Sequence, residues 1–375
     1  MKDEAPRVRL NRLGSLPFTR WAWWTTCSSG IRRASVALLA ALLLVGCSDD
    51  GMESQQPETS DVGVVLSSTD LSLTIFEVDN PAQTRVVGLG PAGSPVSMAL
   101  RGNLAAVPLG IVSAVAVVDL VDGTLTRTVP LPAGSGATGI AFLNDSIVLA
   151  ANPNLNTVTP INVVAGTTGT DIAVGQFPQA VVVEGERAFV LNAELEFFAP
   201  DGPATVSVID IASLTVTSTI TLSGENAAAG GVGPDGLLYI VNSGSFGLAN
   251  GSLSVVNLTS VSEVGHHDGF GDFPGSLALG PSARAFIGAF SYGVAVWDTS
   301  LDAFILGPAE ALTPGGTPST SGVGVDDAGR LYTLTLDCQN PSTANRHDAS
   351  YEIDVTIPVG ICPFAIAFTA IEAGT

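Results

Sequence analysis

A strand, a polar turn and a second strand recur along most of this chain, and this repeat restricts the fold more than any other feature. The two clearest copies are VAVVDLVDGTLTRTVPL at 115–131 and VSVIDIASLTVTSTITL at 206–222. In six copies a polar residue ends the first strand, at intervals of 41 to 48 residues. These residues are Glu77, Asp119, Asn162, Asp210, Asn257 and Asp298. We expect each side chain to accept backbone N–H bonds in the turn that follows it.

Each copy is followed by a corner rich in Gly and Pro and then by an apolar strand. The seven apolar segments cover 94–100, 137–143, 178–184, 227–233, 274–280, 320–326 and 363–369. The full unit has four strands in about 45 residues, which is the size of a propeller blade. The last apolar segment has no partners after it, and the three strands between 62 and 89 have no inner strand before them. The repeat therefore predicts an all-β fold, a seven-bladed β-propeller of four-stranded antiparallel blades that is closed by N-terminal strands pairing with the C-terminal strand.

Several short segments resemble the YVTN-type seven-bladed propeller repeat family. These segments are VSVID, TITL, GPDG and LYIVN, and the resemblance extends over about residues 62–370. It implies the propeller fold and leaves function open, because propellers carry many unrelated activities.

The first 46 residues have the pattern of a bacterial lipoprotein signal peptide. The segment before its apolar run is longer than is usual for such a signal, as if the start had been assigned too early. A basic flank leads into an apolar run of 13 residues, 34–46, which is too short to span a bilayer. The run ends in Leu-Val-Gly-Cys, which resembles a lipobox, so we expect Cys47 to carry lipid. A plain signal peptide is the alternative. Residues 47–61 are expected to form a flexible tether and 62–375 the propeller.

The expected mature chain is acidic. After residue 46 there are seven Arg, no Lys and 33 Asp or Glu, a net charge of −26. This balance opposes nucleic acid and anionic membrane surfaces as partners. We expect a monomeric domain in the bacterial cell envelope, attached through its lipid and favoured at the outer membrane, because Ser48 replaces the aspartate that marks inner-membrane retention in enterobacterial lipoproteins.

Long connections are expected on one face of the ring. The strand order places the connections 193–204, 243–251, 337–347 and 265–273 together, and long loops on a rigid scaffold commonly carry binding residues. Candidate binding residues on this face are Glu194, Glu196, Phe197, Phe198, Asp201, Asp337 and His347.

The connection GHHDGFGDF suggests a metal site. His266, His267, Asp268 and Asp272 offer nitrogen and oxygen ligands, but the spacing matches no established metal motif, and an exposed polar loop is the alternative. The carboxylates Glu194, Glu196 and Asp201 suit Ca²⁺ but lack a regular loop pattern. No cofactor is expected, since the inner strands carry charge only at their turn ends.

Cys338 and Cys362 are the only cysteines after Cys47. Export leads to an oxidising compartment, and both residues are expected on the same face in neighbouring blades. We therefore predict a disulfide between them; two free thiols are the alternative.

The whole pattern favours a non-catalytic binding or scaffold module that acts through the face with long loops. The alternative function is a metal-dependent hydrolase or a lactonase-like propeller enzyme.

Overall fold

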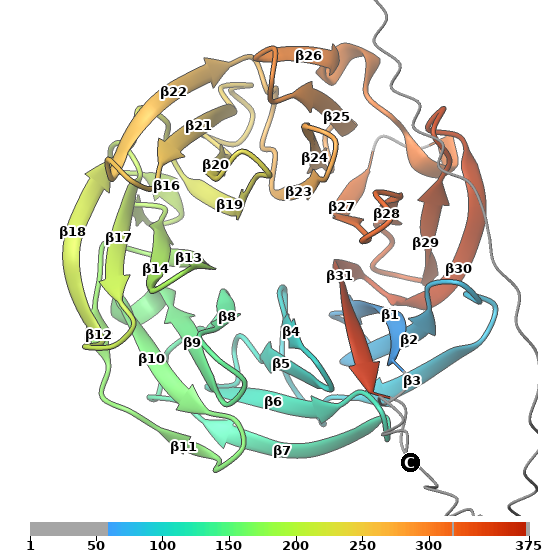
Figure 1. Cartoon of the computed structure of the whole chain (residues 1–375), viewed down its shortest axis with the longest axis horizontal. Helices are drawn as coiled ribbons and strands as arrows, with labels where there is room; N and C mark the ends of the chain where they lie inside the picture. Colours follow the sequence, from blue (N-terminus) through green and yellow to red (C-terminus); the bar gives the residue numbers. More distant parts are fainter. Residues whose placement is uncertain (1–58, 317–318, 373–375) are drawn as a thin grey trace, which may run out of the picture. The chain divides into compact units, whose positions relative to one another are not determined.

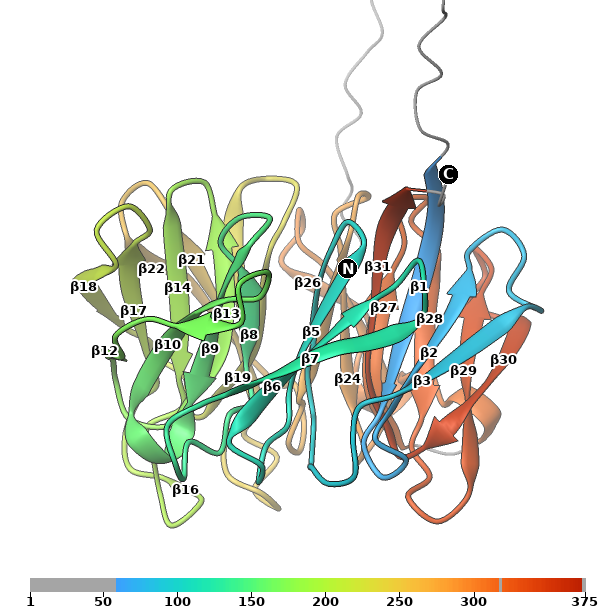
Figure 2. The ribbon, with the colours of Figure 1, turned by 90° about the horizontal axis from the view of Figure 1, so that it is seen from below.

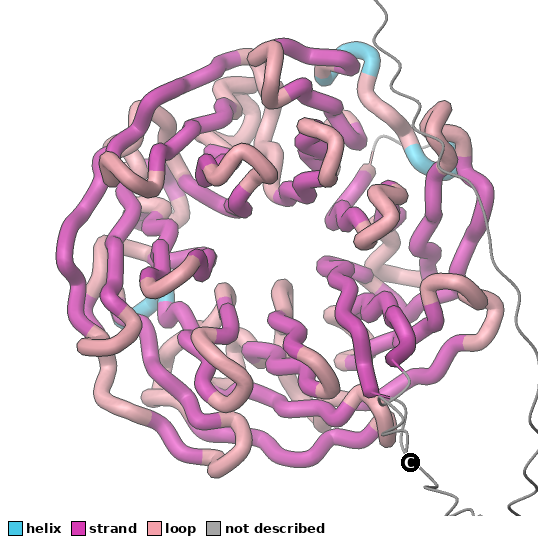
Figure 3. Tube along the Cα trace, in the orientation of Figure 1, coloured by secondary structure: helices cyan, strands magenta, loops and turns pink. Residues whose placement is uncertain are grey.

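The computed structural model describes residues 59–316 and 319–372, which form a ring of seven antiparallel sheets (Figure 1). The sequence prediction of a seven-bladed propeller is confirmed. The signal peptide, Cys47 and most of the expected tether lie outside the described residues. The helical content of the described part consists of three-residue 3-10 turns, at Pro153–Leu155, Pro308–Glu310 and Pro314–Gly316 (Figure 3).

Each blade runs from an inner strand at the axis to an outer strand at the rim, and we number the blades along the chain. Blade 1 contains β31 (Pro363–Glu372), β1 (Thr59–Ser67), β2 (Ser72–Glu77) and β3 (Thr84–Gly88). Blade 2 contains β4 (Ala99–Arg101), β5 (Leu104–Pro108), β6 (Ala114–Asp119) and β7 (Thr124–Pro130). Blade 3 contains β8 (Ile140–Phe142), β9 (Ile147–Asn152) and β10 (Thr157–Asn162), with its outer strand divided into β11 (Thr167–Thr168) and β12 (Ile172–Ala173).

The other four blades follow the same order. Blade 4 contains β13 (Pro178–Glu184), β14 (Arg187–Asn192), β17 (Thr205–Asp210) and β18 (Thr215–Thr221). Blade 5 contains β19 (Ala227–Val232), β20 (Leu237–Asn242), β21 (Ser252–Asn257) and β22 (Ser262–Asp268). Blade 6 contains β23 (Ser276–Gly280), β24 (Arg284–Ala289), β25 (Gly293–Asp298) and β26 (Ala303–Leu306). Blade 7 contains β27 (Thr320–Val325), β28 (Leu331–Thr335), β29 (Pro341–His347) and β30 (Ile353–Ile361).

The core lies between neighbouring blades. The second and third strands of a blade are covered on both faces, so they are nearly continuous apolar runs; β14, for example, is buried from Ala188 to Asn192. Outer strands such as β18 have one face in solvent and alternate Thr and Ser with apolar residues. Position in the blade therefore explains why the repeat mixes fully apolar and alternating strands.

The turns between third and fourth strands are held as the sequence predicts. The side-chain oxygens of Asp119, Asn162, Asp210, Asn257 and Asp298 each accept at least one backbone N–H bond from the next three residues. Blade 7 uses Asp348 in the same way. The turn after Glu77 is different, because the Glu77 backbone carbonyl accepts the bond from the Asn80 N–H.

Polar side chains also connect neighbouring inner strands around the axis. The Thr138 hydroxyl donates to the Gln179 carbonyl at 3.3 Å, and the Gln179 amide donates to Asn226 Oδ1 at 2.9 Å. The Ser97 and Ser321 hydroxyls donate to the Thr138 and Pro363 carbonyls of the next blades. These polar groups hold blades together.

Strands β1 and β31 close the ring. They pair antiparallel from Thr59 with Glu372 to Ser67 with Pro363, which confirms the predicted closure. Strand β1 begins at Thr59, so residues 59–61, expected in the tether, belong to the sheet. The added pairs satisfy backbone groups that two sheet edges would otherwise leave open.

The predicted disulfide is present at this closure. Cys338 follows β28, Cys362 joins β30 to β31, and their Cα atoms are 4.1 Å apart. The Cys362 N–H donates to the Asp337 carbonyl at 2.7 Å, and the Ile361 N–H donates to the Asp70 carboxylate at 2.7 Å. The disulfide thus fixes the position of the segment that leads into β31, the last strand.

We expect the double substitution Cys338→Ala with Cys362→Ala to lower the free energy of unfolding by about 3 kcal/mol, because the unfolded chain loses a cross-link. The measurement is urea unfolding with and without reductant. Reductant should shift the midpoint of the native protein and leave that of the double variant unchanged. Equal midpoints for the native protein under both conditions would contradict a stabilising role.

Candidate binding face

The two ends of the ring differ in their connections. We call the end with the turns between first and second and between third and fourth strands the turn face, and the opposite end the loop face. The first residues of β1 lie at the turn face, whereas the hairpin β15 (Leu195–Glu196) and β16 (Ala199–Pro200) extends from the loop face (Figure 2).

This hairpin presents two phenylalanines to solvent. Glu196 pairs with Ala199, so Phe197 and Phe198 form a two-residue turn, and the two residues are 92% and 83% exposed. Both residues have positive φ, 49° and 64°. Turns of this kind favour Asn-Gly, and bulky residues at positive φ are strained. The structure confirms the predicted location of both residues and places them in a conformation that local backbone preference does not explain.

The carboxylates beside the hairpin have different environments. Glu194 accepts a hydrogen bond from the Thr205 hydroxyl at 2.5 Å, and its backbone N–H donates to the Gln176 carbonyl at 3.0 Å. Glu194 therefore fixes the base of the hairpin. Glu196 is exposed next to the hairpin tip, and Asp201 is exposed at the hairpin base, where its N–H donates to the Glu194 carbonyl at 2.8 Å. The structure does not gather the three carboxylates around one point.

A second group of aromatic rings follows on blades 5 and 6. Phe246, Phe273 and Phe290, which we call the phenylalanine row, have successive ring-centroid separations of 5.7 and 6.1 Å. Phe246 is 71% exposed and Phe290 44%. Leu248, beside Phe246 in the chain, is also exposed. Sequence reasoning missed this row; the loop residues Ser-Gly-Ser-Phe-Gly-Leu at 243–248 were its available signal.

Hydrogen bonds hold the loops beneath the row. Asp272 Oδ1 accepts from the Gly247 N–H at 2.7 Å, which joins the loop after β20 to the connection after β22. The Asp272 carbonyl also accepts a bond from the Ser291 hydroxyl, in the loop after β24. Asp272, predicted as a metal ligand, therefore links three loops.

The arginines are distributed unequally between the two faces, whereas both faces carry acidic residues. The described connections of the loop face contain no Arg or Lys. They contain eight acidic residues: Asp70, Glu194, Glu196, Asp201, Glu225, Asp272, Glu310 and Asp337. The arginines lie at the turn face or on outer strands, and several are paired, as in Arg101 with Asp145 and Arg284 with Asp298. The loop face therefore combines exposed apolar side chains with uncompensated negative charge.

The prediction that His266, His267 and Asp268 lie in a loop is wrong. His266, His267 and Asp268 belong to the outer strand β22, where neighbouring side chains point to opposite sides. His266 Nε2 lies 3.2 Å from Asp268 Oδ1, whereas the His267 ring packs on Trp297 with its Nε2 3.6 Å from Asp302. An outer strand has one face in solvent and tolerates polar residues there. The polarity of residues 265–273 was therefore not evidence for a loop.

The predicted place of His347 is also wrong. His347 ends β29 near the turn face, and its ring is buried between Thr333 and Tyr351. Nδ1 donates to the Tyr351 carbonyl at 2.9 Å, Nε2 accepts from the Thr333 hydroxyl at 2.9 Å, and burial lowers the pKa of the ring. The polar run 341–347 resembled a loop because β29 satisfies its polar groups across the sheet, as in the bond from Asn345 Nδ2 to Thr335 Oγ1 at 3.1 Å.

Asp337 lies on the loop face as predicted, and its carboxylate supports the disulfide loop. It accepts bonds from the Gln339 and Asn340 N–H groups at 2.8 and 3.0 Å. These bonds lower its pKa. The Asp337 carboxylate therefore stabilises its own loop.

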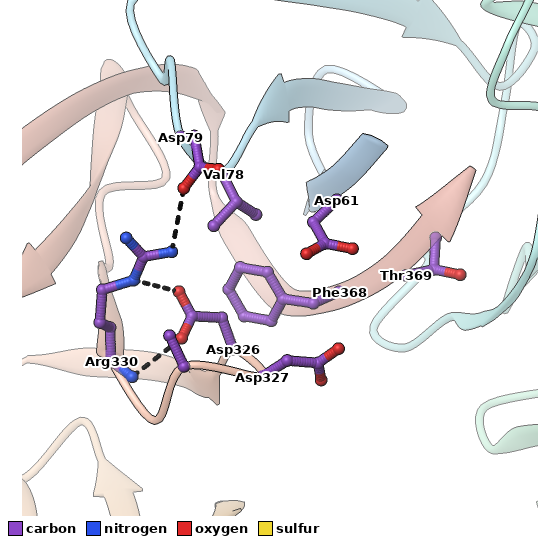
Figure 4. A pocket seen from close by; sticks show the side chains of 9 residues that line it. Asp61, Val78, Asp79, Asp326, Asp327, Arg330, Phe368 and Thr369 are labelled. Atoms are coloured by element: carbon purple, nitrogen blue, oxygen red, sulfur yellow. Dashed lines mark hydrogen bonds and ion pairs between the residues drawn. The ribbon is translucent and has the colours of Figure 1, made fainter. Parts of the chain in front are cut away.

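A small pocket opens on the turn face, between blades 7 and 1 (Figure 4). Its volume is about 130 Å³, and its wall includes Asp61, Phe368 and Asp327. Arg330 Nε donates to Asp326 at 2.6 Å and Nη2 lies 3.7 Å from Asp79, so the ion pairs bridge the closing blades. Asp326 is 4% exposed and its charge is matched by Arg330. The pocket therefore belongs to the closure of the ring.

Within 59–316 and 319–372, no three His, Cys, Asp or Glu side chains lie in a group that could hold a metal ion. The same described residues include no helix with the length and apolar character needed to cross a membrane.

The comparisons with known proteins agree with the fold. No family model and no curated protein matches the chain. A solved structure of hydrazine synthase from Kuenenia stuttgartiensis matches with a TM-score of 0.57 at 15% identity, over 72% of this chain and 91% of that chain. A likeness at this identity supports the propeller architecture alone.

We expect Phe197→Asn with Phe198→Gly to raise the free energy of unfolding by about 1 kcal/mol, because Asn-Gly adopts positive φ with less strain. Chemical denaturation measures this change. Phe246→Asn is the control, since Phe246 is exposed without a positive φ, and it should give no gain. A loss of stability in the double variant would show that the rings support the hairpin.

Proposed function

We propose that this protein is a lipid-anchored, non-catalytic binding or scaffold module of the bacterial envelope, which contacts its partner through the loop face. Membership of the YVTN-type propeller family is part of this proposal. The observation that carries it is the pair Phe197 and Phe198, two exposed aromatic rings in a strained turn. Exposed apolar groups and local strain concentrate where proteins bind partners.

Further exposed apolar side chains extend the same face. Ile111, Leu155, Phe246, Leu248 and Phe290 lie in loops that follow the second strands of blades 2, 3, 5 and 6. All four exposed phenylalanines of the described residues are on this face. Aromatic side chains are enriched at protein interfaces, because they bury a large area at a small entropic cost.

The position of the proposed anchor is compatible with binding through the loop face. Strand β1 begins at the turn face, and Cys47 to Glu58 is a segment that reaches at most about 40 Å when extended. An anchor at Cys47 would attach the domain from its turn-face side, opposite the loop face.

The anchoring part predicts that Cys47→Ala moves the protein from the membrane fraction to the soluble fraction. Fractionation and intact mass measure the change, because a lipid-modified cysteine adds the mass of its acyl chains. Ser48→Ala is the control and should remain in the membrane fraction. Membrane association of Cys47→Ala at the native level would overturn the proposed anchor.

The binding part predicts a covalent adduct in intact cells when a photo-crosslinking phenylalanine analogue replaces Phe198. The same analogue at Leu301, which is 73% exposed on the turn face, is the matched control. Gel electrophoresis after irradiation should show an adduct band from position 198 and none from position 301. Equal labelling at both positions, or none at 198, would contradict the assignment of the loop face.

A further inference from the structure

We infer that the loop face of blades 4 to 6 docks a protein segment that combines apolar side chains with lysine or arginine. This inference rests on the proposed function and adds the chemistry of the partner. The docking surface consists of Phe197 and Phe198 on the hairpin, the phenylalanine row and Leu248.

The apolar part of the surface is arranged before a partner arrives. The Phe198 ring packs edge-on against Phe177 at 5.9 Å, which orients one side of the hairpin tip. Below the phenylalanine row, the Gly251 N–H donates to the Gly271 carbonyl at 2.9 Å and the Ser243 hydroxyl donates to the Pro274 carbonyl at 2.6 Å. A surface whose loops are already ordered pays less entropy on binding.

The charge of the surface selects the partner. Glu196 precedes the hairpin tip, Asp201 lies at the hairpin base, Asp272 is next to Phe273 in the chain, and no Arg or Lys is present in the described loops of this face. Opposite charges across an interface favour association, and like charges disfavour it. Aromatic faces also attract ammonium and guanidinium groups. A partner with both apolar and basic side chains therefore matches both the exposed aromatic rings and the carboxylates of this surface.

The same charges disfavour two other occupants. Two loop faces meeting in a symmetric dimer would bring acidic residues against acidic residues. An anionic lipid surface would meet the same repulsion. Self-association and vesicle binding are therefore outcomes that count against this inference.

The test measures anisotropy of three labelled synthetic peptides of equal length with the purified domain: lysine alternating with leucine, glutamate with leucine, and lysine with serine. We expect the lysine–leucine peptide to bind at least about tenfold more tightly than either other peptide. Raised ionic strength should weaken this binding, because part of it is electrostatic.

Variants locate the binding. Phe246→Ser with Phe290→Ser, and separately Phe197→Asn with Phe198→Gly, should each weaken lysine–leucine binding about tenfold. Glu196→Gln with Asp201→Asn should weaken it about threefold and reduce its salt dependence. Leu301→Ser is the control on the turn face and should bind as the native protein does. Circular dichroism confirms that each variant is folded.

Several results would overturn the inference. These are equal binding of the lysine–leucine and lysine–serine peptides, absence of binding, insensitivity to both phenylalanine pairs, dimerisation through the loop face in sedimentation, or binding to vesicles of phosphatidylglycerol. If the crosslink from position 198 persists while lysine–leucine selectivity is absent, the proposed function stands and the assigned partner chemistry is wrong. If both are absent, both proposals fail.

Discussion

The pairing of β1 with β31 is the constraint on which the rest of this structure depends. A ring of sheets is stable only when its first and last blades meet, and here one blade is built from both ends of the described chain. The disulfide between Cys338 and Cys362 and the bond from the Ile361 N–H to Asp70 fix the segment that leads into β31. Without this pairing, the loops of neighbouring blades would not be held in fixed positions relative to one another.

Closure also separates two chemically different ends. At the turn face, tight turns are capped by Asp and Asn side chains, and arginines are held in pairs such as Arg284 with Asp298. At the loop face, aromatic rings are exposed and acidic side chains have no basic neighbour in the described loops. The two ends therefore differ in what they expose: capped turns and paired arginines at the turn face, and aromatic rings at the loop face.

Much of the fold could be predicted because the repeat is local and regular. The caps at Asp119 and Asp210 and the disulfide follow from spacing and strand order. The histidines were harder to place, because a strand at the rim of a blade, such as β22, carries polar residues without becoming a loop. His347 lies at the end of β29 for a related reason: cross-strand partners satisfy its polar neighbours, and sequence alone does not show those partners.

The sequence by itself determined the number of blades, the closure and the acidity of the chain, because these depend on repeat length and residue counts. It also identified Phe197 and Phe198 as candidates. Only the tertiary structure decided that Phe246, Phe273 and Phe290 form one row, that Asp272 supports loops, and that the arginines lie away from the loop face. These facts depend on contacts between blades about 45 residues apart, which the winding of the ring brings together.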